Sequence, residues 1–313
     1  MEPNPTVDLL QGRISYRDTG AGNTGGGASS GDPIVFVHGL LVDGRLWRKV
    51  TPLLESEFRC IVPDLPLGAH THALRVDADR SPRGVAHLLA DFLEQLGLER
   101  VTLVANDTGG AIAQLLVTER PERIGRLVLT PCDAYENFLP PVFRPLQWLA
   151  RVPGALTFVV QGMRLAPLRR SPLGFGLLTK RPIPDEITGA WAGAFLGDAG
   201  VRRDAIGLLR GIDKRDTLAA AEKLKTFECP TLLAWAAEDR FFKLRFAERL
   251  ARDIPNARLE PIADSGTFVS EDQPERLAEL IAQFAREPYT ATGAGNQSAG
   301  SVPGATSPTI GEK

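Results

Sequence analysis

The sequence predicts an α/β fold with a mostly parallel central sheet, helices on both faces and an inserted helical cap. Continuous apolar runs such as Ile34–Val37 and Cys60–Val62 are typical of parallel strands that are covered on both faces. Strand and helix patterns alternate at both ends of the chain, as in a parallel sheet. Between about Asp133 and Cys229 the alternation is interrupted by Pro-punctuated helical segments, which indicates an insertion.

Each predicted element has its own signal. Gln11-Gly12 marks the turn of an opening hairpin, residues 19–32 form a Gly- and Ser-rich loop, and Ser81-Pro82 begins a helix with a serine cap and a proline in the first position. The predicted strands are Leu9–Leu10, Arg13–Arg17, Ile34–Val37, Cys60–Val62, Val101–Ala105, Arg126–Thr130, Thr231–Trp235 and Leu259–Ile262. The predicted core helices are Leu46–Leu54, those that begin at Pro82 and Thr108, Leu244–Ala251 and Pro274–Arg286.

These patterns divide the chain into four parts. Residues 1–132 are the first part of the α/β core, 133–228 the helical cap insertion and 229–287 the second part of the core. Residues 288–313 are rich in Gly, Ser, Thr, Ala and Pro without an apolar period, so we expect a disordered tail.

The composition excludes several function classes. With 313 residues and a net charge of -2, the chain offers no overall positive field for nucleic acid. No Gly-x-Gly-x-x-Gly motif joins a strand to a helix and no P-loop is present, so we expect no cofactor. The cysteines Cys60, Cys132 and Cys229 are scattered in apolar runs and are interpreted as core thiols rather than metal ligands. The sequence has neither a signal-peptide pattern nor an apolar run of membrane-spanning length, so the expected location is cytoplasmic.

One stretch carries a chemical signal. The strand that ends near Ala105 is followed at once by a helix, and small residues surround Asp107 at the turn. Small residues such as Gly109 and Gly110 are expected at this turn, because the strand and the helix nearly touch there. This is the layout of a nucleophile elbow, which thrusts its tip residue into a site. The alternative is an aspartate that only caps the following helix.

The chain resembles the α/β-hydrolase fold superfamily over residues from about 8 to 287. An aspartate at the elbow narrows the resemblance to the branch of haloalkane dehalogenases, fluoroacetate dehalogenases and epoxide hydrolases, in which a carboxylate attacks carbon. The landmarks are His38-Gly39, Pro63-Asp64, the elbow at Asp107, and Asp239 followed by Ser265-Gly266-Thr267-Phe268.

The resemblance implies a set of roles. Asp107 is the expected nucleophile, and an ordinary aspartate is already ionised at pH 7. The backbone amides of Leu40 and Thr108 are the expected oxyanion hole and also line the substrate site. Asp239 is the expected acid of the triad, with Asp133 as a weaker alternative.

The catalytic histidine of the family is replaced by Thr267. Threonine cannot deprotonate water, a contribution of about 10²- to 10⁴-fold. The histidines are few, and His38 is expected to be structural, with a side chain close to the substrate. His70 and His72 follow a parallel strand, so a substitute base in that loop is one hypothesis, for which we name His70. The alternative is that they are ordinary loop residues.

The substrate is not fixed by the resemblance. The tryptophan, asparagine, arginine and paired cap tyrosines that mark the named enzyme groups are absent at the corresponding positions. Residues 137–184 hold seven basic and no acidic residues, interleaved with apolar ones such as Trp148, which we expect to contact substrate. This segment is either a cationic amphipathic surface for anionic lipid or an amphiphile, or, as we favour, a set of cap helices that pack on the core with solvated arginines.

The sequence therefore predicts an enzyme that hydrolyses an apolar small molecule through Asp107. One alternative is a lyase, isomerase or cyclase that uses Asp107 as a general base. Another is a ligand-binding protein that kept the fold and lost turnover. Nothing in the sequence predicts the oligomeric state.

Overall fold

The computed structural model describes residues 4–20, 32–172 and 174–288. Its centre is an eight-stranded sheet with the order β1-β2-β4-β3-β5-β6-β7-β8. The strands β1 and β2 pair antiparallel, β2 is also antiparallel to β4, and every other neighbouring pair is parallel. The strands are β1 Thr6–Leu9, β2 Gly12–Asp18, β3 Ile34–Val37, β4 Cys60–Pro63, β5 Val101–Asp107, β6 Ile124–Cys132, β7 Thr231–Ala236 and β8 Ala257–Ile262.

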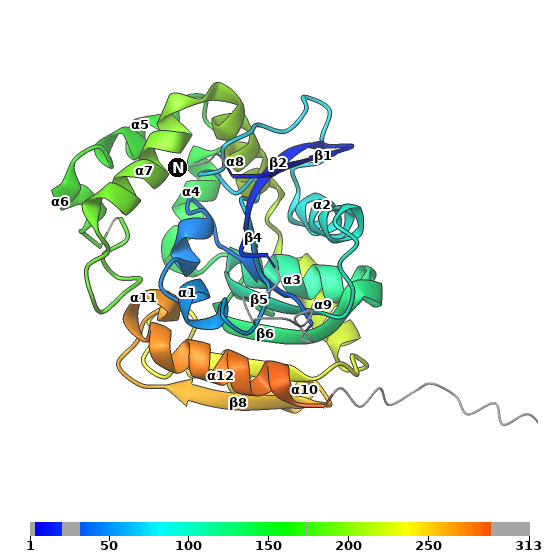
Figure 1. Cartoon of the computed structure of the whole chain (residues 1–313). Coiled ribbons are helices and arrows are strands. Elements are labelled where there is room, and N and C mark those ends of the chain that lie inside the picture. The colour runs from blue at the N-terminus through cyan, green and yellow to red at the C-terminus, as the bar shows by residue number, and fades with distance from the viewer. Residues whose placement is uncertain (1–3, 21–31, 173, 289–313) are drawn as a thin grey trace, which may run out of the picture.

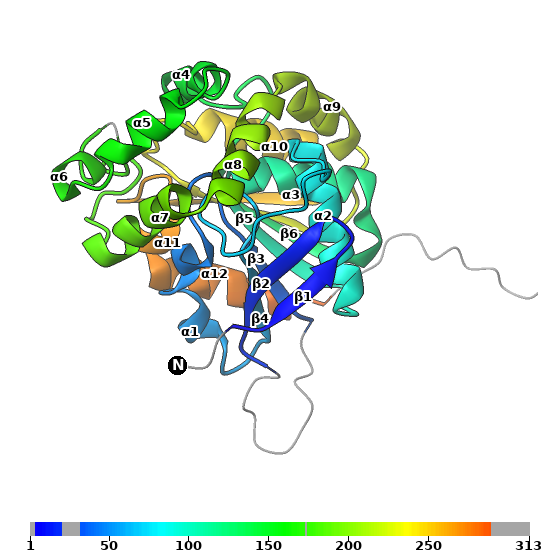
Figure 2. The ribbon, with the colours of Figure 1, turned by 90° about the horizontal axis from the view of Figure 1, so that it is seen from above.

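Helices cover both faces of the sheet (Figures 1 and 2). The buried side chains of α2 Pro82–Gln95, α3 Thr108–Glu119, α9 Lys214–Leu224 and α10 Leu244–Asp253 form one core cluster with the sheet. Those of α1 Thr51–Leu54 and α12 Pro274–Arg286 belong to a second cluster on the other face, and the short α11 Val269–Asp272 precedes α12. The α/β prediction is confirmed, because the sheet is sandwiched between two apolar layers.

Local signals decide where elements begin. The Ser81 hydroxyl accepts a hydrogen bond from the Gly84 amide at 3.0 Å, so the predicted cap of α2 is present. The predicted helix Leu46–Leu54 is instead split into a 3₁₀ turn, Gly44–Trp47, and α1. The proline at position 52 explains the split, since proline donates no amide hydrogen bond and is tolerated only in the first turn of a helix.

The described residues between β6 and β7 form helices and turns, with one isolated bridge between Ala134 and Asn137 and no strand. The helices are α4 Arg144–Leu149, α5 Ala155–Gly162, α6 Ala166–Arg169, α7 Asp185–Gly197, α8 Ala199–Gly211 and α9. Figure 1 shows α5 to α8 together at one end of the sheet. Side chains of α5, α7 and α8 share a third apolar cluster, which also includes Ala111 of α3. Helix α9 instead packs on α3, and its buried side chains belong to the cluster that α3 shares with the sheet.

Parts of the sequence predictions fall outside the described residues. The predicted tail lies beyond residue 288, and most of the predicted loop 19–32 lies in the undescribed stretch 21–31. Among the described residues, no helix is both long enough and apolar enough to span a membrane.

Candidate functional site

Asp107 is the last residue of β5 and directly precedes α3. Its backbone has φ 55° and ψ -134°, a conformation that is costly for a residue with a side chain. The strand-to-helix turn imposes this conformation, because the parallel partners β3 and β6 fix the strand. The residue remains partly accessible, although the residues around it are buried. The predicted elbow geometry is therefore present.

Two glycines make the elbow possible. A Cβ atom on Gly39 would lie 2.1 Å from Oδ2 of Asp107. A Cβ atom on Gly109 would lie 2.3 Å from the carbonyl oxygen of His38. Both distances are far below van der Waals contact, so any side chain here would displace the elbow or the His38-Gly39 turn.

The Asp107 carboxylate lies at the backbone amides that the sequence predicts. The amide of Leu40 donates a hydrogen bond to Oδ2 at 3.2 Å. The Thr108 amide is the second backbone donor near this carboxylate. Burial raises the pKa of Asp107 to about 6, while the Thr108 and Leu40 amides oppose the rise. The carboxylate is therefore mostly ionised at pH 7, is held by backbone amides, and has no ion-pair partner among the described residues.

Asp133 is a second carboxyl group beside Asp107. It directly follows β6, is fully buried, and accepts a hydrogen bond from the Thr108 hydroxyl at 3.4 Å through Oδ2. Its Oδ1 is buried and has no hydrogen-bond partner among the described residues. Burial and the nearby charge of Asp107 raise its pKa well above the ordinary value, which favours the protonated form. Asp133 is thus suited to a proton-carrying role rather than to that of a second anion.

Asp239 and Thr267 meet at the place where the family's acid and base belong. The Thr267 hydroxyl donates to Oδ2 of Asp239 at 2.7 Å. The amides of Phe241 and Phe242 donate to Oδ1 at 2.6 and 2.7 Å. Burial raises the pKa of Asp239, and these three hydrogen bonds oppose the rise. Because the Thr267 hydroxyl hydrogen-bonds to the Asp239 carboxylate, no histidine ring among the described residues is hydrogen-bonded to it.

Asn106 is a site residue that the sequence analysis missed. Its Nδ2 lies 2.8 Å from the carbonyl oxygen of Thr267, 2.9 Å from Oγ1 of Thr130 and 3.0 Å from the carbonyl oxygen of Pro131. It thereby ties the loop of Thr267 to the end of β5, next to Asp107. Its only sequence signal is a polar residue in an otherwise apolar strand.

His38 holds the turn that carries Leu40. Its Nε2 accepts a hydrogen bond from the Leu65 amide at 2.9 Å, and its Nδ1 lies 3.0 Å from the carbonyl oxygen of Gly39. This pattern corresponds to the neutral tautomer with a proton on Nδ1. Burial lowers the pKa of His38 to about 4. Both nitrogens are engaged by the backbone, so the structural role expected for His38 agrees with its contacts, and no ring nitrogen is left to bind substrate.

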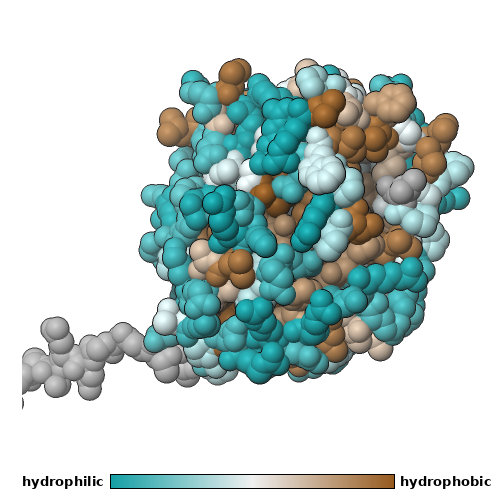
Figure 3. All heavy atoms as spheres, turned by 180° about the vertical axis from the view of Figure 1, so that it is seen from behind, coloured by the Kyte–Doolittle hydropathy of each residue, from teal (hydrophilic) through white to brown (hydrophobic). Residues whose placement is uncertain are grey.

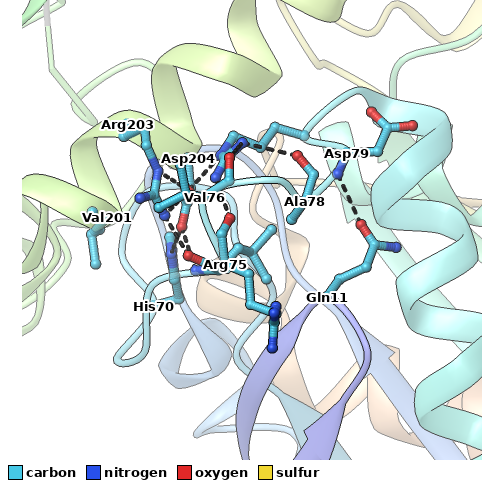
Figure 4. A network of polar contacts seen from close by, with 12 residues as sticks. Gln11, His70, Arg75, Val76, Ala78, Asp79, Val201, Arg203 and Asp204 are labelled. Atoms are coloured by element: carbon cyan, nitrogen blue, oxygen red, sulfur yellow. Dashed lines mark hydrogen bonds and ion pairs between the residues drawn. The ribbon is translucent and has the colours of Figure 1, made fainter.

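His70 belongs to another carboxylate (Figure 4). Its Nδ1 accepts from the Gly68 amide at 3.3 Å, and its Nε2 lies 3.3 Å from Oδ2 of Asp204 in α8. The side chains of His70 and Asp204 are both buried. With both nitrogens engaged, His70 makes no hydrogen bond to Asp107 and is not placed as a base for it.

Asp204 is the centre of this second polar network. Its four other contacts come from the loop before α2 and from α8 itself. They are the Leu74 amide at 2.7 Å to Oδ2, and Arg80 Nε at 2.7 Å and Arg203 Nε at 3.0 Å to Oδ1, with an ion pair from Arg203 Nη2 at 3.0 Å. Asp204 therefore fixes residues 70–80 against α8.

The other predicted contact residue, Trp148, lies away from Asp107. Trp148 of α4 is 74% exposed on the outside of the molecule and is not enclosed with Asp107. Cavities of about 230, 310 and 470 Å³ are lined by other parts of the chain and not by Asp107. Within the described ranges, no group of three or more His, Cys, Asp or Glu residues is arranged to hold a metal ion.

Comparisons with known proteins agree with this geometry. The sequence model of the alpha/beta hydrolase fold family matches residues 32–274. The chain is 26% identical over 251 residues to the uncharacterized hydrolase YugF of Bacillus subtilis (80% of this chain, 89% of the relative). It is 28% identical over 273 residues to a cis-3-alkyl-4-alkyloxetan-2-one decarboxylase of Shewanella oneidensis (83% and 84%) and 25% identical over 289 residues to haloalkane dehalogenase 2 of Mycobacterium tuberculosis (88% and 92%).

The family match covers most of the chain and includes the His38-Gly39 turn, the elbow and the Asp239–Thr267 pair. The parallel sheet, the elbow at the end of β5 and the order of the site residues along the chain all agree with it. The chain therefore belongs to the alpha/beta hydrolase fold family.

Proposed function

We propose that this protein is a hydrolase that attacks an electrophilic carbon of an apolar small molecule with the carboxylate of Asp107. One observation carries the proposal. The carboxylate is held at the elbow tip with Oδ2 on the Leu40 amide, remains partly accessible, and has no ion-pair partner among the described residues. A nucleophile needs this combination of a fixed orientation and access to the substrate.

The first step needs no base. Oδ1 of Asp107 forms a bond to the carbon while the bond to the leaving group breaks, and the leaving group departs with the electron pair. The result is an alkyl ester of Asp107. A pKa of about 6 leaves the carboxylate mostly ionised at pH 7. The neighbouring Asp133, whose pKa is raised, is the candidate to supply a proton where the leaving group is an alkoxide.

Release of the ester by water is the slow step in this proposal. Water must attack the ester carbonyl of Asp107, and the resulting oxyanion would be stabilised by the Leu40 and Thr108 amides. Deprotonation of that water is left to solvent, since Thr267 occupies Asp239. The missing general base corresponds to about 10²- to 10⁴-fold in rate.

A second candidate avoids water altogether and is favoured by the same Asp239–Thr267 pair. The relative named as an oxetan-2-one decarboxylase acts on a strained four-membered lactone. If Asp107 attacks ring carbon 4 of such a lactone, the ring C–O bond breaks and frees the carboxylate on carbon 3. Loss of CO₂ then forms the carbon–carbon double bond as the ester bond to Asp107 breaks. The products are an alkene, CO₂ and free Asp107, so the balance needs no water and no base.

The test is incubation of the protein with a primary alkyl bromide, an epoxide and a 3,4-dialkyl oxetan-2-one, followed by intact mass and product analysis. We expect an added alkyl mass from the bromide or epoxide, or alkene with CO₂ from the lactone. Asp107→Asn should abolish each reaction, while Asp77→Asn, at an exposed carboxylate, is the matched control. If Asp107→Asn keeps any of these activities, Asp107 is not the nucleophile.

A further inference from the structure

The exposed apolar residues of this chain are concentrated in one segment. Eleven large hydrophobic side chains are exposed among the described residues, and seven of them lie within residues 142–168. We name these seven side chains the outer-helix surface. They are Val142, Trp148, Val152, Phe158, Val159, Leu165 and Leu168.

The helices beneath this surface explain which side chains face outward. Helix α4 packs on α8, and α5 and α6 pack on α7. In α5, Leu156 and Val160 are buried, whereas Phe158, about 200° around the helix from Leu156, is 81% exposed. The apolar side of α5 that points away from the protein therefore has no covering element among the described residues.

The figures place these side chains on one outer edge. In Figure 2, α4, α5 and α6 follow one another along the edge of the molecule. In Figure 3, brown hydrophobic spheres gather at the upper right, over these helices. Exposed apolar patches of this kind are typical of interaction surfaces rather than of free monomer surface.

The segment that carries the outer-helix surface is basic. Residues 137–184 contain no Asp or Glu, although Asp185 at the start of α7 pairs with Arg169 and Arg170. The exposed Arg144 and Arg164 make no ion pair among the described residues, and Arg151 bonds only to the carbonyl oxygen of Gln147 at 3.1 Å. The expectation that the apolar side chains of this segment pack on the core is therefore wrong for the outer-helix surface. Arg144, Arg151 and Arg164 are exposed as expected, whereas Arg169 is buried.

We propose that the outer-helix surface docks on an anionic lipid bilayer. Exposed Trp, Phe and Leu side chains can enter the boundary between headgroups and acyl chains, and unpaired arginines can face the lipid phosphates. A bilayer fits both features at once. A second copy of this surface fits less well, because an isologous contact would place two surfaces of the same net positive charge against each other. The proposal does not depend on the chemistry of Asp107.

The tryptophans provide an internal probe. Of the four in the chain, Trp47, Trp191 and Trp235 are fully buried, and Trp148 alone is exposed. A blue shift of tryptophan emission on addition of vesicles therefore reports that Trp148 has left water. We expect this shift with vesicles of phosphatidylcholine and phosphatidylglycerol in equal parts, and a much smaller one with phosphatidylcholine alone.

Flotation of the full chain with the same vesicles measures the affinity. Phe158→Ser and Leu165→Ser together should weaken binding by roughly tenfold or more. Replacement of Arg144, Arg151 and Arg164 by Gln should weaken it by roughly fivefold per arginine. The matched control is Leu10→Ser with Val76→Ser, which removes two other exposed apolar side chains and should change nothing.

Salt and self-association complete the test. Raising the ionic strength from about 0.1 to 1 M shortens the Debye length from roughly 10 to 3 Å, so binding to the anionic vesicles should fall. Equal binding to neutral and anionic vesicles, or equal loss in the control and outer-helix variants, would overturn the proposal. So would a dimer that is lost in Phe158→Ser while the wild-type chain binds no vesicles, because the partner would then be a second copy.

Discussion

Asp107 and Asp204 are both aspartates held by the protein interior, but their surroundings differ in kind. Asp204 accepts from two arginines, a histidine and a backbone amide, and these contacts lower its pKa even though burial opposes them. Asp107 accepts from the Leu40 amide, has no cationic partner, and its pKa is raised to about 6 by burial. The first is stabilised as an anion by cations, and the second is held by backbone amides without a neutralising charge.

This difference separates a structural carboxylate from the proposed nucleophile. Asp204 is hydrogen-bonded to charged and polar partners through both carboxylate oxygens, and these bonds hold residues 70–80 against α8. Asp107 instead has a strained backbone conformation, and its carboxylate has no cationic partner among the described residues. Such costs are typical of functional sites, where stability is exchanged for chemistry.

The largest expected effect is a loss of stability on replacement of Asp204. Asp204→Ala removes the acceptor of two buried or half-buried guanidinium groups, so we expect a loss of about 3–5 kcal/mol in the free energy of unfolding. Chemical denaturation measures it. The control Asp77→Ala, at a carboxylate that is 80% exposed, should change stability by less than about 0.5 kcal/mol. Equal losses in the two variants would remove the structural role of Asp204.

Asp107→Asn should instead increase the free energy of unfolding. Because the folded-state pKa of about 6 lies above the ordinary aspartate value of 3.8, ionisation costs stability as pH rises through this window. At pH 7 the amide should therefore stabilise the fold by about 1–3 kcal/mol, and the gain should vanish near pH 4. Thermal unfolding at both pH values checks this, and a gain that is independent of pH would contradict the assigned cause.

The pH dependence of ester formation should follow Asp107 alone. A pKa of about 6 predicts that the rate of adduct formation rises about tenfold between pH 5 and pH 7 and then levels. Quenched intact-mass measurements with an alkyl bromide give the rate. A profile that is flat across this range would mean that Asp107 titrates at its ordinary value.

The smallest effect is expected at His70. His70→Gln retains a donor toward Asp204, so we expect a loss of about 1 kcal/mol in stability and no change in the rates of adduct formation or release. Denaturation and kinetics on the same sample separate the two properties. A release rate that falls strongly while stability is kept would restore His70 as the base.

Much of the fold could be predicted because its signals are local. The apolar run at Ile34–Val37 and the cap at Ser81 concern neighbouring residues, and both elements form as expected. The elbow was also predictable, since Gly109 follows Asp107 within the same turn. The split of the predicted helix Leu46–Leu54 shows that a single proline outweighs an apolar pattern.

The site was predictable only in part, because its partners are distant in sequence. His70 and Asp204 are 134 residues apart, and nothing in the loop sequence indicates that both ring nitrogens are already engaged. The link from Asn106 to the Thr267 loop spans 161 residues. The exposure of Trp148 likewise depends on which face of α4 meets α8, and the sequence pattern alone does not decide this.

The most direct test of the account is a single measurement on Asp107. The protein is incubated with a primary alkyl bromide in H₂¹⁸O at pH 7, quenched, digested, and the peptide that contains Asp107 is weighed. We predict that the alkyl ester accumulates on Asp107 with little ¹⁸O in its carboxylate, because attack is fast and no base activates water. A free Asp107 that gains ¹⁸O at each turnover, or a peptide with neither alkyl group nor label, would contradict the account.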